Sequence, residues 1–167
     1  YQGKKLTIRK PLDAIRNGIV YLPEERKLQS LFLELTVREN IMPLWLYTVY
    51  DNMITDVRQE KDIAEDMVEK LEIKTPGTEE EIVGLSGGNQ QKAIFSRLLA
   101  VNPKVMILND PTRGVDVKSK ESIYGYMREL ARQGTSILFL SSEIPEINYL
   151  ANRVVVLSKG EVCGEFY

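Results

Sequence analysis

The sequence contains no histidine and only one cysteine, Cys163. The absence of imidazole excludes any chemistry within this chain that uses histidine as a base or as a metal ligand. A single cysteine cannot form an intrachain disulfide, which agrees with a reducing compartment. Any catalytic or binding chemistry of the chain must therefore come from other side chains.

Long apolar runs and a strong charge of one sign are also missing. The most apolar window, residues 41–50, contains Pro43 and is well short of the roughly 20 residues of a membrane-spanning helix. The chain has 22 basic and 24 acidic residues, a formal net charge of −2, and shows no basic patch of the kind that nucleic-acid binders carry. Its 167 residues, 43% of them hydrophobic, suit one domain with a real core.

The second half of the chain alternates apolar runs with amphipathic segments. Buried strands are predicted at 104–108, 135–140 and 153–157, helices at about 89–100, 116–134 and 143–151, and a final hairpin through 159–160. In the first half we expect a strand at 18–22, a helix with a Thr36–Glu39 capping box, an amphipathic helix from Met53 to Leu71 and a loop at 74–84. This order predicts an α/β fold with a parallel sheet flanked by helices.

The segment LSGGNQQK at 85–92 is suited to holding a phosphate. Ser86 supplies a hydroxyl, Gly87 and Gly88 let backbone N–H groups approach a ligand, and the following helix adds partial positive charge. Taken alone, the letters SGG favour an ordinary loop in which serine or asparagine caps a helix. The segments that follow decide between the two interpretations.

Those segments follow the order of an ATP-binding cassette. After LSGGNQQK come a helix, Pro103, an apolar strand and DPTRGVD at 110–116, and the sequence here resembles the second cassette of the tandem-cassette ATPases that drive bacterial sugar importers of the ribose, galactose and xylose type. GIVYLPEERK (18–27), PTRGVDV (111–117) and SSEIPEI (141–147) are similar to that family too. The resemblance covers nearly the whole chain. It implies a P-loop NTPase-like α/β core at 1–27 and 101–167, with a mostly parallel sheet, and a helical subdomain at about 28–100.

The resemblance also implies a mechanism shared between two cassettes that sandwich ATP. The residues that would hold the γ-phosphate of an ATP bound to a partner cassette are Ser86, Gly87, Gly88 and Gln90. Glu24 would occupy the Q-loop position, Asp116 the D-loop position at the dimer seam, and Ser142 the switch position that is histidine in most cassettes. Glu24 and its charged neighbours are also compatible with a solvated turn.

The chain departs from the family pattern in the half-site that would bind its own nucleotide. No G-x-x-x-x-G-K-[ST] stretch is present, and residue 1 resembles a truncation that leaves out the P-loop and the N-terminal strands. Asn109 stands where the family has the aspartate that orders Mg²⁺, and Asp110, at the Walker B acid position, is one methylene shorter than glutamate. A register with Asp110 as the metal ligand would leave Pro111 as the base. ATP and Mg²⁺ are therefore expected for the assembled parent, and little activity for this chain alone.

Three functions stay open at this point. The leading one is a component of a carbohydrate-importing ATPase at the cytoplasmic face of the membrane, paired with the first cassette of the same polypeptide or with another cassette copy. Permease subunits and, indirectly, a sugar-binding protein would be its other partners. The second is a non-catalytic regulatory or dimerisation cassette, and the third, disfavoured by the charge balance, is a soluble cassette ATPase acting on nucleic acid or ribosomes. Residues 28–50 would either face the permease or pack inside the helical subdomain, and we expect the chain alone to self-associate or to have low stability.

Overall fold

A three-stranded parallel sheet organises the computed structural model, which describes residues 1–49 and 56–167, without the side chains of residues 26 and 27. Its strands are β1 (Ile19–Leu22), β2 (Val105–Asn109) and β3 (Ser136–Leu140), in the order β1-β2-β3. The register places Tyr21 beside Ile107 and Ile107 beside Leu138. The predicted parallel sheet is confirmed.

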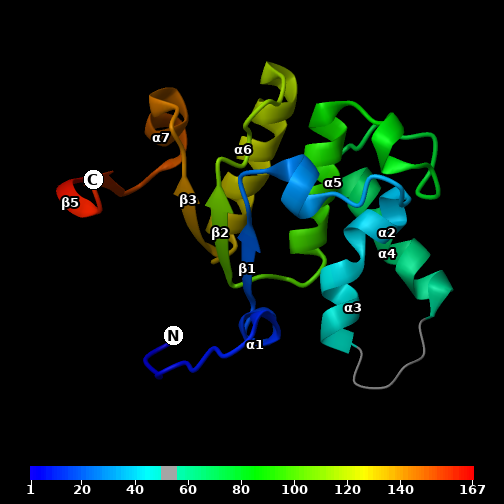
Figure 1. Ribbon diagram of the computed structural model, residues 1–167, viewed down its shortest axis with the longest axis horizontal. Helices are drawn as coiled ribbons and strands as arrows, with labels where there is room; N and C mark the ends of the chain where they lie inside the picture. The colour runs from blue at the N-terminus through cyan, green and yellow to red at the C-terminus, as the bar shows by residue number, and fades with distance from the viewer. Residues whose placement is uncertain (50–55) are drawn as a thin grey trace.

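Helices lie in both connections between neighbouring strands, as is usual for parallel pairing. The helices between β1 and β2 are α2 (Val37–Ile41), α3 (Pro43–Val49), α4 (Val57–Lys70) and α5 (Gly87–Leu99). A single helix, α6 (Val117–Arg132), connects β2 to β3. Figure 1 shows α2, α3 and α4 gathered beyond α5, on the side away from β3. The division into a core and a helical subdomain at 28–100 stays a prediction.

Polar residues in extended conformation start four of these segments. Thr36 and Glu39 form the predicted capping box of α2, with Thr36 Oγ1 accepting from the Glu39 backbone N–H. Asp56, Ser86 and Asp116 cap α4, α5 and α6 in the same way through a side-chain oxygen. The expected helix at 89–100 therefore begins two residues earlier, because the Ser86 cap offsets the weak helix propensity of two glycines.

One face of the sheet is buried and the other is largely open. Val20, Leu22, Met106 and Leu108 point to the buried face and are at most 2% exposed. On the opposite face, Tyr21 is 56% and Leu138 is 60% exposed. The hydrophobic core therefore lies between the sheet and helices α5 and α6, and it continues among α2, α4 and α5.

Two predictions of buried strands are wrong. β3 alternates exposed and half-buried residues, because it lies at the edge of the sheet and one of its faces is uncovered. Residues 153–157 do not join the parallel sheet: β4 (Val154–Ser158) pairs antiparallel with β5 (Glu161–Phe166) and is mostly exposed. The apolar run at 104–108 is fully buried only at Met106 and Leu108. The hairpin through 159–160 is confirmed.

The remaining elements are short. They are α1 (Pro11–Arg16), a π-helical turn (Arg26–Ser30), a 3₁₀ turn (Ile82–Gly84) inside the expected loop at 74–84, and α7 (Ile144–Leu150). The predicted helix at 53–71 is confirmed from Val57, while Met53 lies outside the described residues. Within residues 1–49 and 56–167, no helix combines the length and apolar character that crossing a bilayer requires.

Candidate functional site

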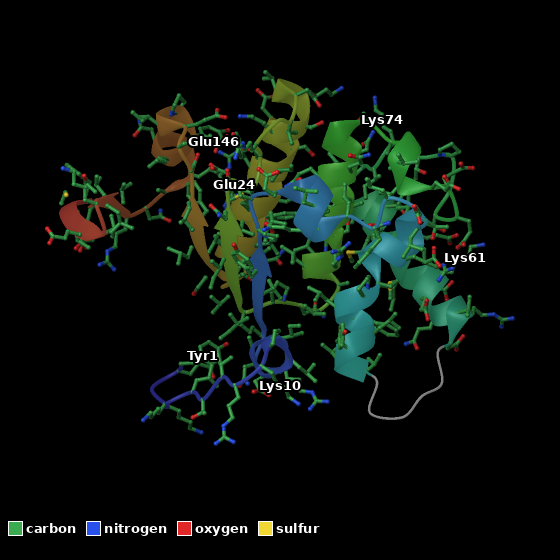
Figure 2. All side chains as sticks on the ribbon, in the orientation of Figure 1. Tyr1, Lys10, Glu24, Lys61, Lys74 and Glu146 are labelled. Atoms are coloured by element: carbon green, nitrogen blue, oxygen red, sulfur yellow. The ribbon has the colours of Figure 1, made fainter. Side chains whose placement is uncertain are left out.

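Three of the predicted site residues follow the carboxyl ends of the three parallel strands. Glu24 comes after β1, Asp110 directly after β2, and Ser142 after β3. Parallel strands end at the same edge of a sheet, which is where α/β folds bind ligands. Figure 2 shows Glu24 at this end of the molecule and Tyr1 and Lys10 at the other.

Asp110 is held in an unusual backbone conformation next to Ser142. Its φ of +43° lies in the left-handed region, which aspartate tolerates better than most residues. Its Oδ1 accepts a hydrogen bond of 3.2 Å from the Ser142 backbone N–H. Strained backbone persists only where the surroundings enforce it, and it gathers at functional sites. The structure thus brings together the two positions predicted to be catalytic.

Glu24 forms an ion pair with Arg113, which lies on the loop between β2 and α6. Glu25 is 3.8 Å from the same guanidinium. The Glu24 side chain is 38% exposed and that of Arg113 is 58% exposed, so the pair contributes little to stability. The contact nevertheless connects the predicted Q-loop position with the loop that leads to Asp116.

The predicted signature loop forms the start of α5. Ser86 is exposed, and its Oγ accepts from the backbone N–H of Asn89 at 3.4 Å and from Asn89 Nδ2 at 3.1 Å. Asn89 Oδ1 in turn accepts from the Lys74 backbone N–H at 3.0 Å. A serine oxygen has two lone pairs, and with both accepting bonds, its own hydrogen is directed away from Asn89. The Ser86 hydroxyl is therefore available as a donor to an outside acceptor.

Gly88 is buried against the start of α6. A Cβ at this position would lie 2.7 Å from Asp116 Oδ2 and 2.8 Å from Ser119 Cβ, and nearer still to Ser119 Oγ. Asp116 caps α6 by accepting from the Ser119 backbone N–H at 3.0 Å. Hydrogen bonds from Ser119 hold the pKa of Asp116 below its usual value. Gly88 thus lets the predicted signature and D-loop residues meet within one chain.

Two glutamines of α5 point into the protein. Gln90 is 5% exposed, and its amide donates to the carbonyl of Ile82 at 3.1 Å. A phosphate contact by Gln90, as the resemblance implies, would require this buried side chain to become accessible from outside the chain. Gln91 is 4% exposed and donates to the Pro111 carbonyl at 2.5 Å, which attaches α5 to the loop after β2.

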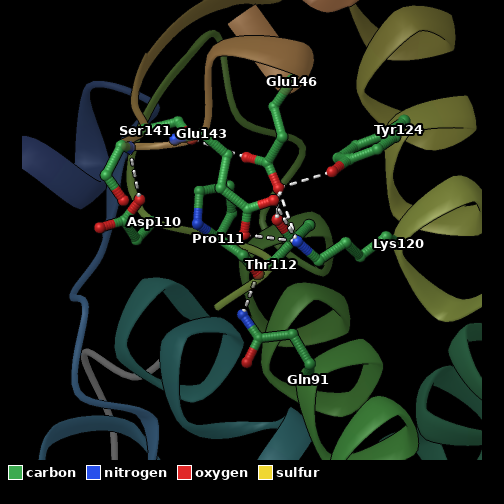
Figure 3. A network of polar contacts seen from close by, with 10 residues as sticks. Gln91, Asp110, Pro111, Thr112, Lys120, Tyr124, Ser141, Glu143 and Glu146 are labelled. Carbon is green, nitrogen blue, oxygen red and sulfur yellow. Dashed lines mark hydrogen bonds and ion pairs between the residues drawn. The ribbon is translucent and has the colours of Figure 1, made fainter. Parts of the chain in front are cut away.

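Sequence reasoning missed Asn89, Gln91, Ser119 and Glu146. The only signal for the first two was the polar run NQQK at the start of a helix whose remaining residues are mostly apolar. Glu146 offered no signal, since a glutamate in a short helix is ordinarily solvated. In the structure it is 4% exposed and lies among donors from several segments (Figure 3).

The donor set near Asn109 does not by itself fit a magnesium ion. Mg²⁺ prefers carboxylate oxygens in an octahedral arrangement. Asn109 offers one neutral carbonyl oxygen, and one carboxylate oxygen of Asp110 already accepts from Ser142. Across the part of the chain that the structure describes, no cluster of three or more acidic, cysteine or histidine side chains has metal-binding geometry. The described residues therefore do not form a magnesium site by themselves.

Comparison with known proteins shows the family of this chain. Residues 1–113 match the family model described as "ABC transporter", and the chain belongs to that family. It is 42% identical to the ribose import ATP-binding protein RbsA of Yersinia pestis over 99% of its length, and 42% identical to the xylose import ATP-binding protein XylG of Moorella thermoacetica over 98%. The chain spans about a third of the length of these curated relatives (32% of each).

Solved structures confirm the fold. A nucleotide-free ATP-binding cassette from an ABC transporter superposes with a TM-score of 0.78 at 21% identity, covering 99% of this chain and 67% of that one. A dimeric cassette in a post-hydrolysis state bound to ADP and Pi superposes with a TM-score of 0.75 at 24% identity, covering 90% and 63%. The predicted α/β ABC ATPase fold is thus confirmed.

Proposed function

We propose that this chain is part of the second cassette of a sugar-importing ABC ATPase, and that it completes an ATP site whose P-loop belongs to a partner cassette. The observation that carries the proposal is the exposed Ser86 side chain at the N-terminus of the buried helix α5: its Oγ accepts from Asn89, and its O–H can donate to an outside acceptor. Donors at a helix N-terminus favour an anion such as a terminal phosphate. The names of the relatives refer to the import of ribose and of xylose, which are both pentoses. The proposal therefore includes a pentose as the class of sugar that the importer carries.

The other predicted site residues have subordinate roles in this proposal. Gly87 keeps the approach to the phosphate free of a side chain, and Gly88 lets the loop pack against the start of α6. Gln90 holds the 3₁₀ turn before the loop by donating to the carbonyl of Ile82. Asp116, exposed at the start of α6, would face the partner at the dimer seam.

The edge of the sheet would serve the chain's own nucleotide less well. Glu24 would sense nucleotide at the Q-loop position, Ser142 would donate to phosphate at the switch position, and Asp110 would orient water. Asn109 leaves the metal position without a charge. We therefore expect the partner's site, rather than this chain's own, to carry most of the ATP turnover.

Substitution of Ser86 tests the proposal. Ser86→Asp preserves a strong helix cap but places negative charge where the phosphate would lie. We expect it to lower ATP turnover by a partner cassette that carries a P-loop by about 10²-fold, the scale for losing one donor to a reacting oxyanion. Ser86→Thr, which retains the hydroxyl, should stay within about threefold of the wild type.

The matched control is Ser158→Asp, which adds the same charge to the exposed end of β4. It should leave turnover unchanged. Far-UV circular dichroism checks that the three variants fold alike. Equal turnover with Ser86→Asp and with the wild type would contradict the proposal.

Contact with a permease is proposed for residues 28–35. Leu28 is 85% exposed and Phe32 is 49% exposed, which leaves apolar area uncovered at this surface. Crosslinking from Gln29→Cys in a Cys163→Ser background tests this contact, because Gln29 and Cys163 are both exposed. Ser30 is unsuitable for this purpose, since it is only 5% exposed. A crosslink to the permease supports the contact, and its absence at saturating reagent contradicts it.

The neutral side chain of Asn109 favours a second candidate function, a regulatory or dimerisation cassette without nucleotide contact. Calorimetric titration of Mg-ATP into the chain paired with a P-loop-bearing cassette separates the two. Loss of part of the ATP affinity with Ser86→Asp supports the shared site. Unchanged affinity favours the regulatory function.

A further inference from the structure

Glu146 on α7 is a buried carboxylate that accepts hydrogen bonds from four side chains (Figure 3). The donors to Glu146 Oε1 are Thr112 Oγ1 at 2.5 Å, Tyr124 OH at 2.6 Å and Lys120 Nζ at 3.1 Å, and the donor to Oε2 is Ser141 Oγ at 2.8 Å. A buried charge is tolerated only when it is paired and fully hydrogen-bonded. Both conditions are met, so this carboxylate can stay ionised inside the protein.

Electrostatics at Glu146 agree with that geometry. Burial acts to raise the pKa of Glu146, but the bonds from Thr112, Tyr124, Ser141 and Lys120 outweigh it and leave the pKa below its ordinary value. Burial and the contact with Glu146 raise the pKa of Tyr124 to about 12. The network therefore keeps one arrangement of protons over the neutral range.

The four donors come from three segments: the loop after β2, helix α6 and the loop after β3. Thr112 lies on the loop after β2, two residues beyond Asp110, and Ser141 lies on the loop after β3, one residue before Ser142. The other two donors, Lys120 and Tyr124, belong to α6. Glu146 is thus the common acceptor for both loops that follow the neighbouring strands.

The orientation of Ser141 strengthens the link to its loop. Ser141 Oγ accepts from the backbone N–H of Glu143 at 3.0 Å, so its own hydrogen is free to bond to Glu146. Ser142, between these two residues, donates its backbone N–H to Asp110 Oδ1. If Glu146 released Ser141 and Thr112, both ends of the Ser142–Asp110 bond would lose a side-chain support, and the 2.9 Å bond from the Asp110 backbone N–H to the Leu140 carbonyl would remain.

We propose that Glu146 is a positioning residue that fixes Asp110 and Ser142 relative to one another by holding the loops after β2 and β3. The importance for catalysis of the distance between Asp110 and Ser142 rests on the roles proposed above for these two residues. The spacing itself is a property of this chain and can be measured without nucleotide.

The experiment compares Thr112→Val with Thr112→Ser and follows amide hydrogen exchange by NMR. Valine keeps the shape of threonine but removes the hydroxyl, whereas serine keeps the hydroxyl and removes a methyl group. We expect Thr112→Val to speed hydrogen exchange of the Ser142 amide at least about tenfold relative to the amides of Met106 and Leu108 in β2. In Thr112→Ser, the Ser142 amide should exchange at the wild-type rate. A role in packing alone predicts the reverse order, since Thr112 is 1% exposed and serine would leave a cavity.

Glu146→Gln is the second variant. Its amide accepts through one oxygen only and cannot pair with the charge of Lys120. The Ser142 amide should again exchange faster than those of Met106 and Leu108, and adding Thr112→Val should give little further change because both substitutions break the same link. Faster exchange of all three amides together, or no change at Ser142, would overturn the assignment. Neither result depends on the Ser86 assay, so the two proposals fail separately.

Discussion

Substitution of Gly88 by alanine tests whether the signature loop is built around contacts inside its own chain. An added methyl group would collide with Ser119 and with Asp116, the residue that caps α6. The two helix N-termini would have to separate, or Asp116 would have to give up its bond to the Ser119 backbone. Either response destabilises the fold in the absence of any nucleotide.

The magnitude follows from three contributions. Overpacking in a tight contact costs about 1–3 kcal/mol. Loss of the Asp116 cap costs about 1 kcal/mol, and replacing glycine by alanine in a helix returns about 1 kcal/mol. The net expectation for Gly88→Ala is a loss of about 1–3 kcal/mol in the free energy of unfolding.

Urea unfolding followed by circular dichroism measures this difference. With an m-value of about 2 kcal/mol/M, the midpoint should fall by about 0.5–1.5 M. The control is Gly125→Ala in the middle of α6, where nothing lies within 4 Å of the new Cβ and alanine should stabilise the protein by up to about 1 kcal/mol. Ser119→Ala in the Gly88→Ala background removes the nearest atom and should recover part of the loss.

A Gly88→Ala variant as stable as the wild type would refute the reasoning, because the close approach of α5 to α6 would then carry no cost. The clearest refutation would be an equal gain in stability in the Gly88→Ala and Gly125→Ala variants. In that case the glycine would be required only by an outside ligand.

Three other outcomes are expected. Asn40→Leu should lower the free energy of unfolding, measured in urea, by about 3 kcal/mol. The reason is that Asn40 is fully buried and its side chain forms 2.9 Å hydrogen bonds with both the backbone N–H and the C=O of Phe32. A loss under about 1 kcal/mol would contradict this expectation. Since the pKa of Glu146 is lowered on folding, its ionised form stabilises the protein above about pH 4.5 and that stability is lost as the pH falls through the folded-state pKa. The stability difference between wild type and Glu146→Gln should therefore shrink on acidification, and a constant difference from pH 7 to pH 3 would count against the network. Leu138→Lys should reduce self-association of the chain in light scattering, because Leu138 and Tyr21 leave an apolar sheet face open, and a monodisperse wild type would refute that expectation.

The sequence predicted elements well where local chemistry decides. The Thr36–Glu39 box, the strand after Asn17-Gly18 and the hairpin through Lys159-Gly160 each depend on neighbouring residues, and each is confirmed. The burial of strands was predicted less well. An apolar run shows that a strand can be buried, but it does not show whether other elements cover one face, both faces or neither. β4 is the clearest case, since its valines suggested a third core strand and they lie on an exposed hairpin.

The site was predicted as a set of positions and not as a set of contacts. The order of motifs predicted functional positions at Glu24, Asp110 and Ser142, and the structure places all three after the carboxyl ends of parallel strands. The Glu24–Arg113 pair and the Glu146 network could not be predicted, since their partners meet only after the sheet has closed. Gln90 shows the opposite case, a residue implicated by resemblance whose amide is engaged inside the protein.

The strand order has a consequence for how this chain assembles during translation. Among residues 1–49 and 56–167, β1 pairs with β2, and helices α2, α3, α4 and α5 lie between them in the chain. The β1–β2 pair therefore cannot form until the whole intervening segment has been synthesised, whereas α2, α4 and α5 can already pack against one another. Nascent chains stalled before residue 105 should consequently contain this helical cluster and a strand β1 that lacks its β2 partner, a species that invites chaperone binding.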